Sequence, residues 1–111
     1  MKPVSLAFPA AVAGTADTAL FLLRRPKLFR TAPGRAFGSL GFLAVWSTLA
    51  ARTQYEGRDS PAPYTVALAA TAFGGSAAML AVHLRHGVAG PRVFLGALCG
   101  GVALADCLRR R

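Results

Sequence analysis

The chain has 111 residues, enough for one domain; 54% of them are hydrophobic and only 15% are charged. A soluble domain usually carries about 25% charged residues. The net charge of +9 would suit a nucleic-acid binder, but the basic residues gather in short clusters between long uncharged runs. This distribution argues against a nucleic-acid partner, because it places the charges at the edges of segments that suit a lipid bilayer.

Four apolar segments define the predicted fold. They cover about residues 4–23, 36–52, 64–84 and 88–108. A helix of about 20 apolar residues crosses a bilayer, and the second segment is the shortest of the four. Because short links make successive helices antiparallel neighbours, the sequence predicts an all-α membrane protein with four transmembrane helices. We expect residues 1–111 to form this single domain.

Small residues recur at helical spacing within these segments. Lipid tails are as apolar as leucine, so membrane helices associate through close van der Waals contact, which small residues permit. The expected packing faces contain Gly14 in the first segment, Gly38 and Gly41 in the second, Gly74 and Gly75 in the third, and Gly96 and Gly100 in the fourth. The spacing does not say whether the partner helix belongs to the same chain.

Asp17 is an acidic residue well inside an apolar segment. An intramembrane carboxylate is costly and by default marks a functional site or a specific partner. Asp17 lies about two turns from Arg24 and Arg25, near the expected membrane interface. We therefore favour a structural polar contact for Asp17 over a proton or ion role.

No residue pattern predicts catalysis, a metal or another cofactor. His83 and His86 are spaced i, i+3, but no further Cys, His or acidic residue lies nearby to complete a metal site. Glu56 and Asp59 stand beside arginines in the link between the second and third segments, where they predict a solvated charged turn. We expect a structural protein, not an enzyme.

A basic cluster follows the first apolar segment. Its members are Arg24, Arg25, Lys27, Arg30 and Arg35. Basic residues next to a membrane helix attract anionic lipid by about 1 kcal/mol each. The expected ligand is an anionic phospholipid such as cardiolipin, or an acidic face of a partner. Basic residues are almost equally numerous on the two sides, so this dense early cluster decides the topology and places the first link inside.

Several features of the second half occur in a characteristic order. The charged entry 56–64 precedes the small-residue segment 69–78, the turn 85–90 and the glycine-rich segment 96–101. In this order they resemble the mitochondrial inner-membrane import translocase (Tim) superfamily of four-helix proteins. The resemblance covers residues 36–108. It implies an internal import signal, the mitochondrial inner membrane, and both termini in the intermembrane space.

Within that superfamily, the run Asp59-Ser-Pro-Ala-Pro-Tyr64 looks most like the accessory subunit of respiratory complex I (NADH:ubiquinone oxidoreductase). This resemblance implies a non-catalytic subunit of the membrane arm that supports assembly of the complex or supercomplex. Its partners would be other membrane subunits of the large complex.

Two other functions stay open. A translocase or solute-channel component of the same superfamily would need a hydrophilic lining, and the candidates for it are Ser39, Ser47, Thr48, Thr65, Thr71 and Ser76. A free-standing bacterial transporter or holin is the third possibility.

Overall fold

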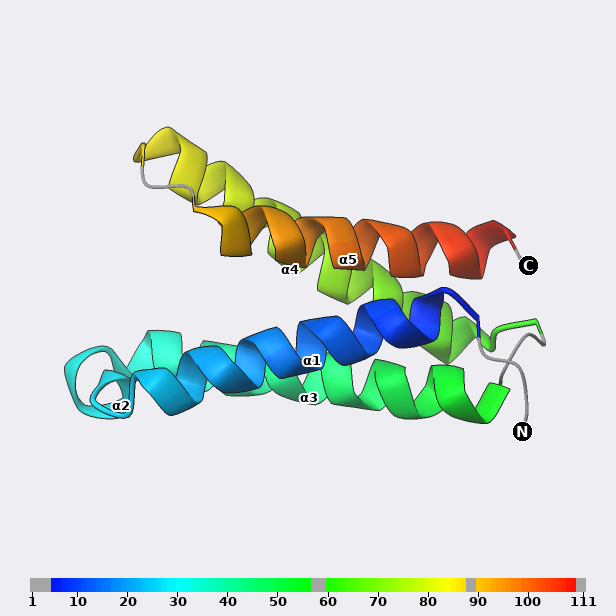
Figure 1. Cartoon of the computed structure of the whole chain (residues 1–111), viewed down its shortest axis with the longest axis horizontal. Coiled ribbons are helices and arrows are strands. Elements are labelled where there is room, and N and C mark those ends of the chain that lie inside the picture. Colours follow the sequence, from blue (N-terminus) through cyan, green and yellow to red (C-terminus); the bar gives the residue numbers. More distant parts are fainter. Residues whose placement is uncertain (1–4, 57–59, 88–89, 110–111) are drawn as a thin grey trace.

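The computed structural model describes residues 5–56, 60–87 and 90–109. Helices make up nearly all of this part of the chain, and none of it forms a strand. The helices are α1 (Ala7–Arg24), α2 (Leu28–Thr31), α3 (Pro33–Glu56), α4 (Pro63–Arg85) and α5 (Pro91–Arg109). Figure 1 shows two antiparallel hairpins, α1–α3 with α2 at its turn and α4–α5. The all-helical prediction is confirmed.

The helix bounds correct two details of the prediction. α3 begins at Pro33 and extends to Glu56, well beyond the predicted range 36–52. The apolar pattern ends near Arg52, but Arg52 pairs with Glu56 one turn later, and such a pair supports a further helical turn. The basic link also contains a short helix, α2, which the four predicted segments do not include.

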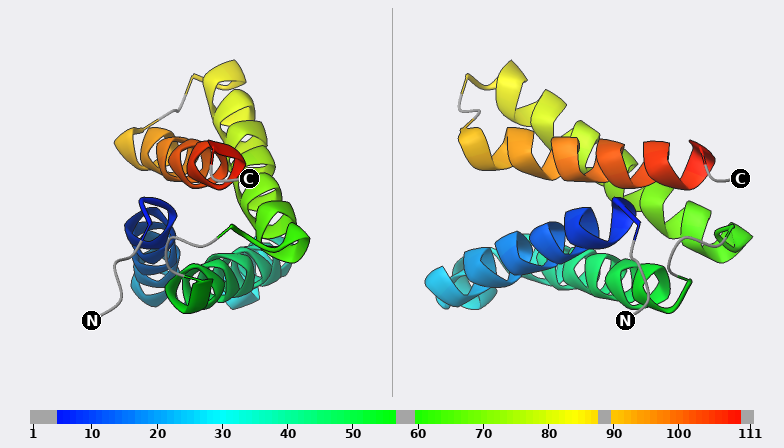
Figure 2. Two further views of the ribbon diagram at one scale, coloured as in Figure 1. Left: turned by 90° about the vertical axis from the view of Figure 1, so that its right-hand side faces the viewer. Right: turned by 45° about the vertical axis from the view of Figure 1, so that its right-hand side comes forward.

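The four long helices form a ring in cross-section. α1 packs against α3 and α5, and α4 packs against α3 and α5 (Figure 2). The two hairpins lie close where α1 and α4 begin, and their ribbons diverge toward α2. We call the end at which the two hairpins lie close, and which holds Glu56 and Asp106, the polar end. The opposite end, which holds residues 24–35, is the basic end.

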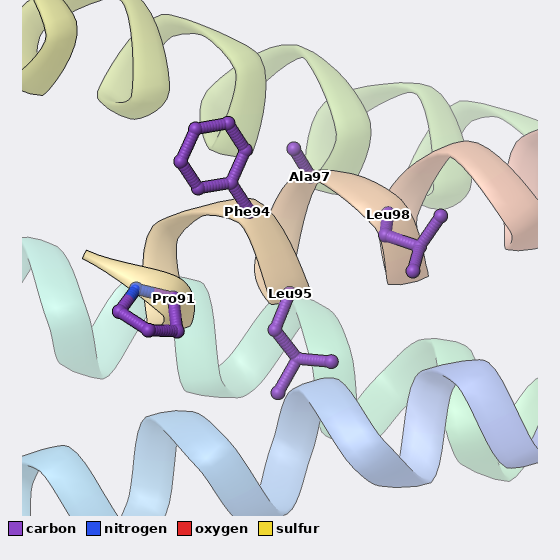
Figure 3. Close-up of a pocket in the computed structure, with 5 residues that line it drawn as sticks. All are labelled: Pro91, Phe94, Leu95, Ala97 and Leu98. Atoms are coloured by element: carbon purple, nitrogen blue, oxygen red, sulfur yellow. The ribbon is translucent and has the colours of Figure 1, made fainter. Parts of the chain in front are cut away.

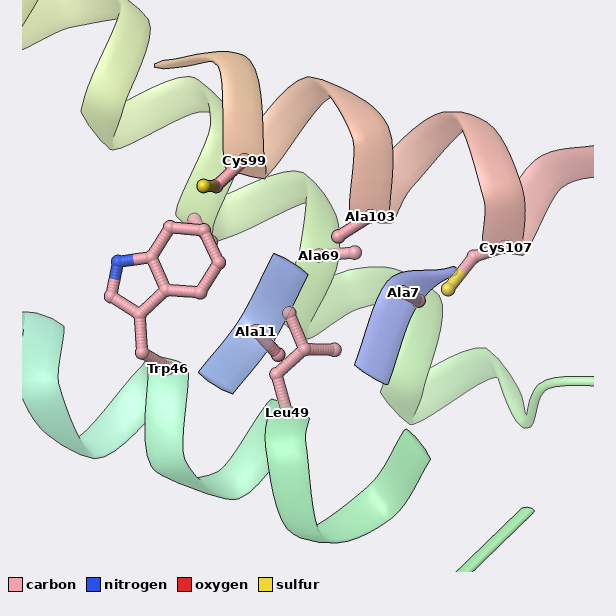
Figure 4. Packing of buried hydrophobic residues seen from close by; sticks show 9 residues of the cluster. Ala7, Ala11, Trp46, Leu49, Ala69, Cys99, Ala103 and Cys107 are labelled. Carbon is pink, nitrogen blue, oxygen red and sulfur yellow. The ribbon is translucent and has the colours of Figure 1, made fainter. Parts of the chain in front are cut away.

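The core contains few large side chains. Trp46 and Leu49 of α3 are its largest apolar members, at 1% and 0% exposure. The other helices contribute mostly small residues to this core, among them Ala72. Figure 4 shows Ala7, Ala11, Ala69 and Ala103 around these two side chains. Small inner faces let the helix backbones approach closely.

The two cysteines are part of the same core. Cys99 and Cys107 are buried on α5 and form no disulfide. Eight residues of helix separate them by about 12 Å, which excludes a bond between them.

Among the described residues, α4 is the one helix that is both long and apolar enough to cross a membrane. Its outward side chains are exposed, including Met79 (51%), Val82 (53%) and Leu84 (55%). A core helix of a soluble protein would bury such residues. The structure is therefore an all-helical chain with one helix suited to a bilayer, and it does not establish four spans.

Candidate functional site

Two of the predicted packing glycines lie directly under aromatic rings of α3. A Cβ atom built on Gly14 of α1 would lie 2.6 Å from Cε2 and Cε3 of Trp46. One built on Gly75 of α4 would lie 2.7 Å from Cζ of Phe42. Real Cβ atoms do not approach other heavy atoms this closely. A side chain at either position would therefore require the Trp46 or Phe42 ring to move.

The two helices of the second hairpin meet at Gly100. A Cβ atom there would lie 2.8 Å from the Cα atom of Phe73 in α4. Because this neighbour is a backbone atom, it cannot rotate away as a side chain could. Gly96 is less constrained, since its Cβ would meet Ser76 Oγ at 3.6 Å, an ordinary contact distance.

The other three predicted packing glycines have no close neighbour among the described residues of other helices. An added Cβ at Gly38, Gly41 or Gly74 would have no such atom within 4 Å. All three are exposed on the outside of the bundle. These positions are open to close packing by a second molecule.

At the polar end, Glu56 joins α3 to the start of α4. Its Oε2 atom accepts hydrogen bonds from the backbone N–H of Ala62 (3.1 Å) and from Oγ1 of Thr65 (2.8 Å). Arg52, one turn earlier, completes the group with an ion pair of 3.1 Å. Ala62 precedes the first turn of α4, so the carboxylate satisfies a helix N-terminus, where negative charge is favourable.

This arrangement corrects the prediction of a solvated charged turn at Glu56. The side chain is 8% exposed and belongs to a helix. The sequence could not show this burial, because the bonding partners of Glu56 belong to the next helix. The other acidic residue of that predicted turn, Asp59, lies outside the described residues.

Asp106 makes the equivalent connection between α5 and α1. Its Oδ2 atom accepts a hydrogen bond from the backbone N–H of Ala7 (3.2 Å), 99 positions away in sequence. Its Oδ1 atom pairs with Arg109 at 2.7 Å. Asp106 is only 5% exposed. The sequence analysis did not single out this residue, although its spacing of three from Arg109 near a helix end was the available signal.

Asp17 belongs to neither of these two connections. It lies half-buried on α1, ten residues beyond Ala7, or about 15 Å along the helix. If Asp17 makes the predicted structural polar contact, that contact lies farther along the bundle, away from the polar end.

The five predicted basic residues all lie exposed at the basic end. None of Arg24, Arg25, Lys27, Arg30 and Arg35 forms an ion pair with another described residue. The Arg25 guanidinium lies over the ring of Phe21, 5.4 Å from its centroid. Two apolar surfaces lie near these basic residues, toward the basic end of the bundle.

The first surface is a groove between α1, α2 and α3, beside the basic residues. Its walls include Leu22, Leu23, Pro26, Phe29, Leu40 and Leu43. The second is a shallow apolar shelf on the first half of α5, lined by Pro91, Phe94, Leu95, Ala97 and Leu98 (Figure 3). Both surfaces are exposed in this chain, and neither carries a charged side chain among its lining residues.

The remaining predicted polar features do not converge on one place. Thr71 and Ser47 are exposed and donate to carbonyl groups of their own helices. Thr65 is bonded to Glu56 at the polar end. No channel lining is assembled from these three hydroxyl groups.

The described residues include no cluster of three or more His, Cys, Asp or Glu side chains that could hold a metal ion. The ring of His83 lies against its own helix, with Nδ1 2.7 Å from the carbonyl oxygen of Met79. His86 is exposed at the end of α4.

Comparisons with protein-family models, curated proteins and solved structures found no match to this chain.

Proposed function

We propose that this chain is a non-catalytic accessory subunit of a large membrane complex, in which its helices hold other membrane subunits in place. The observation that carries the proposal is the distribution of apolar surface. Apart from Trp46 and Leu49 of α3, the buried core consists mostly of small residues, and large apolar side chains are exposed on every long helix. Such an outer surface suits lipid and partner helices, and it is unfavourable in water.

The exposed face of α3 is the proposed contact with a partner helix. Gly38 and Gly41 leave open space there, with Phe37 beside them at 65% exposure. Close approach of a second helix to such a face is a common mode of membrane association. Gly74 of α4 also has open space around it, but we place no partner contact there.

The specific complex is proposed on the resemblance of residues 36–108 to the Tim superfamily. On that basis the chain belongs to the membrane arm of mitochondrial respiratory complex I, where it supports assembly of the complex or supercomplex. It then lies in the inner membrane with four spans and with both termini in the intermembrane space. The basic end lies in the matrix.

Co-migration tests this proposal. The tagged full-length chain is solubilised from its native membrane in mild detergent and separated on a native gel. We expect it to migrate with NADH dehydrogenase activity. Migration with protein-import components would support the translocase alternative instead, and migration as a lone homo-oligomer would overturn both assignments.

Two variants locate the contact. Gly38→Leu fills open space on α3 and should remove co-migration while leaving the bundle folded. Gly74→Leu makes the same change on α4 and serves as the matched control. Equal co-migration of the Gly38→Leu variant and the unmodified chain would contradict the proposed contact.

A further inference from the structure

The groove beside α2 is apolar along its whole lining. It lies between the C-terminal half of α1 and the first half of α3, and its lining includes Pro26 and Phe29 at the basic end. The open groove has a volume of about 470 Å³, within the range of small-ligand sites, about 300–1,000 Å³. Leu23 and Leu40 are 76% and 39% exposed, so the groove is open along one side. It can therefore accept an apolar segment of another molecule.

The rim of the groove is strongly basic. Exposed basic residues adjoin the lining residues in the sequence: Arg24 follows Leu23, and Lys27 and Arg30 follow Pro26 and Phe29. No acidic residue occurs between positions 18 and 55. The cations at this rim form no ion pair with the described residues. They therefore keep their full attraction for an anion from outside the chain.

We propose that this groove binds one molecule of an anionic phospholipid. An acyl chain lies along Leu22, Leu40 and Leu43, and the phosphate group is bound by Arg24, Lys27 and Arg30. The inference rests on the proposed membrane location, which supplies the lipid. It adds to that proposal a defined site and a ligand class.

Both halves of the site are needed to choose this ligand. A free phosphate would use the cations but leave the groove empty. A zwitterionic lipid would fill the groove but bring a cation of its own to a basic rim. An acidic protein segment would neutralise the rim, but it has no flexible chain of methylene groups to match an apolar groove without a polar lining residue.

Lipid titration tests the site. The full-length chain, purified in detergent micelles, is titrated with dioleoyl-phosphatidylglycerol or dioleoyl-phosphatidylcholine, and bound lipid is counted by native mass spectrometry. We expect one tightly bound phosphatidylglycerol and no equivalent phosphatidylcholine. Each basic residue near a membrane surface contributes a factor of about fivefold in affinity. The triple variant Arg24→Gln/Lys27→Gln/Arg30→Gln should therefore bind phosphatidylglycerol about 100-fold more weakly.

The groove is tested separately from the charges. Ala19 is a small residue of the groove lining, and Ala19→Trp fills the groove without altering any charge. We expect about tenfold weaker binding, equivalent to losing contact with about two methylene groups. Arg85→Gln is the matched charge control, because Arg85 is exposed at the end of α4 and is not part of the groove. It should change the affinity less than twofold.

Three outcomes would overturn the inference. Equal binding of both lipids would remove the charge recognition. Full competition by soluble glycerol 3-phosphate would indicate a phosphate site without an acyl chain. Binding of an acidic protein with unchanged lipid binding in the triple variant would assign the rim to a protein partner. The helix content of each variant, measured by circular dichroism, separates these results from unfolding. Absence of phosphatidylglycerol binding by the unmodified chain, with co-migration retained, would overturn only this inference and leave the proposed function intact.

Discussion

The two ends of the bundle differ in whether, among the described residues, their charged side chains are buried and paired or exposed and unpaired. At the polar end, Glu56 and Asp106 are buried, and each carboxylate bonds the start of a helix and an arginine of its own helix. At the basic end, five cations are exposed without an ion pair to any described residue. A buried charge is stable only with its partners in place, whereas an exposed one is free to bind something else. The polar end thus suits holding the hairpins together, and the basic end suits binding.

The largest expected effect concerns Glu56. Glu56→Ala removes the acceptor for Ala62 and Thr65 and the partner of Arg52. Because the Thr65 hydroxyl is buried, it loses its acceptor without gaining water, and we expect a loss of about 3 kcal/mol in the free energy of unfolding. Trp46, the only tryptophan, is buried in the core and reports unfolding by its fluorescence in detergent micelles. A loss below about 0.5 kcal/mol lies within the range of ordinary surface substitutions. Such a result would contradict the role of Glu56 in holding the polar end together.

The second-largest expected loss of stability comes from substitution of Gly100, which lies at the contact between the two helices of one hairpin. Gly100→Ala brings a Cβ atom to 2.8 Å from the Phe73 backbone, and overpacking of this kind costs about 2 kcal/mol. Gly74→Ala is the control within the same hairpin, because open space surrounds Gly74. There the same substitution should stabilise α4 by about 0.5–1 kcal/mol. Equal shifts for both variants would contradict the packing described for Gly100.

Asp106 should have a smaller effect than Glu56. Asp106→Asn keeps an oxygen that can accept from the N–H of Ala7, but it loses the charge attraction to Arg109 and to the start of α1. Arg109 is 69% exposed and can turn to solvent. We expect a loss of about 1 kcal/mol, measured as for Glu56. The same loss for Asp106→Ala would indicate that only the charge matters at this position.

The sequence was sufficient for some parts of this structure and insufficient for others. Apolar segments and short links predicted four long helices, because these signals act within one stretch of chain. Small residues predicted close packing, and at Gly14, Gly75 and Gly100 an aromatic residue or backbone of another helix lies against the glycine. The pattern could not separate these positions from Gly38 and Gly41, since the difference lies in what stands opposite each of them.

For the same reason, the sequence predicted the basic residues of the candidate site but not the contacts of its buried carboxylates. The basic cluster is local in sequence, and its exposure at one end agrees with its composition. The partners of the two buried carboxylates are not local. Asp106 meets Ala7 from the other end of the chain, and Glu56 meets residues beyond an intervening link. An acidic residue near the end of one helix does not reveal in the sequence which other helix N-terminus it will contact in the fold.

The smallest expected effect on stability belongs to the basic end, and it makes the comparison sharpest. Arg24→Gln/Lys27→Gln/Arg30→Gln should change the free energy of unfolding by less than about 0.5 kcal/mol, although it removes three charges. None of these side chains has a buried or ion-paired role among the described residues, and their mutual repulsion decreases on neutralisation. The measurement is the same Trp46 fluorescence in lipid-free detergent micelles. A loss comparable to that of Glu56→Ala would mean that the basic end supports the fold as the polar end does. If stability is unchanged and anionic lipid then stabilises only the unmodified chain, the division between a holding end and a binding end stands.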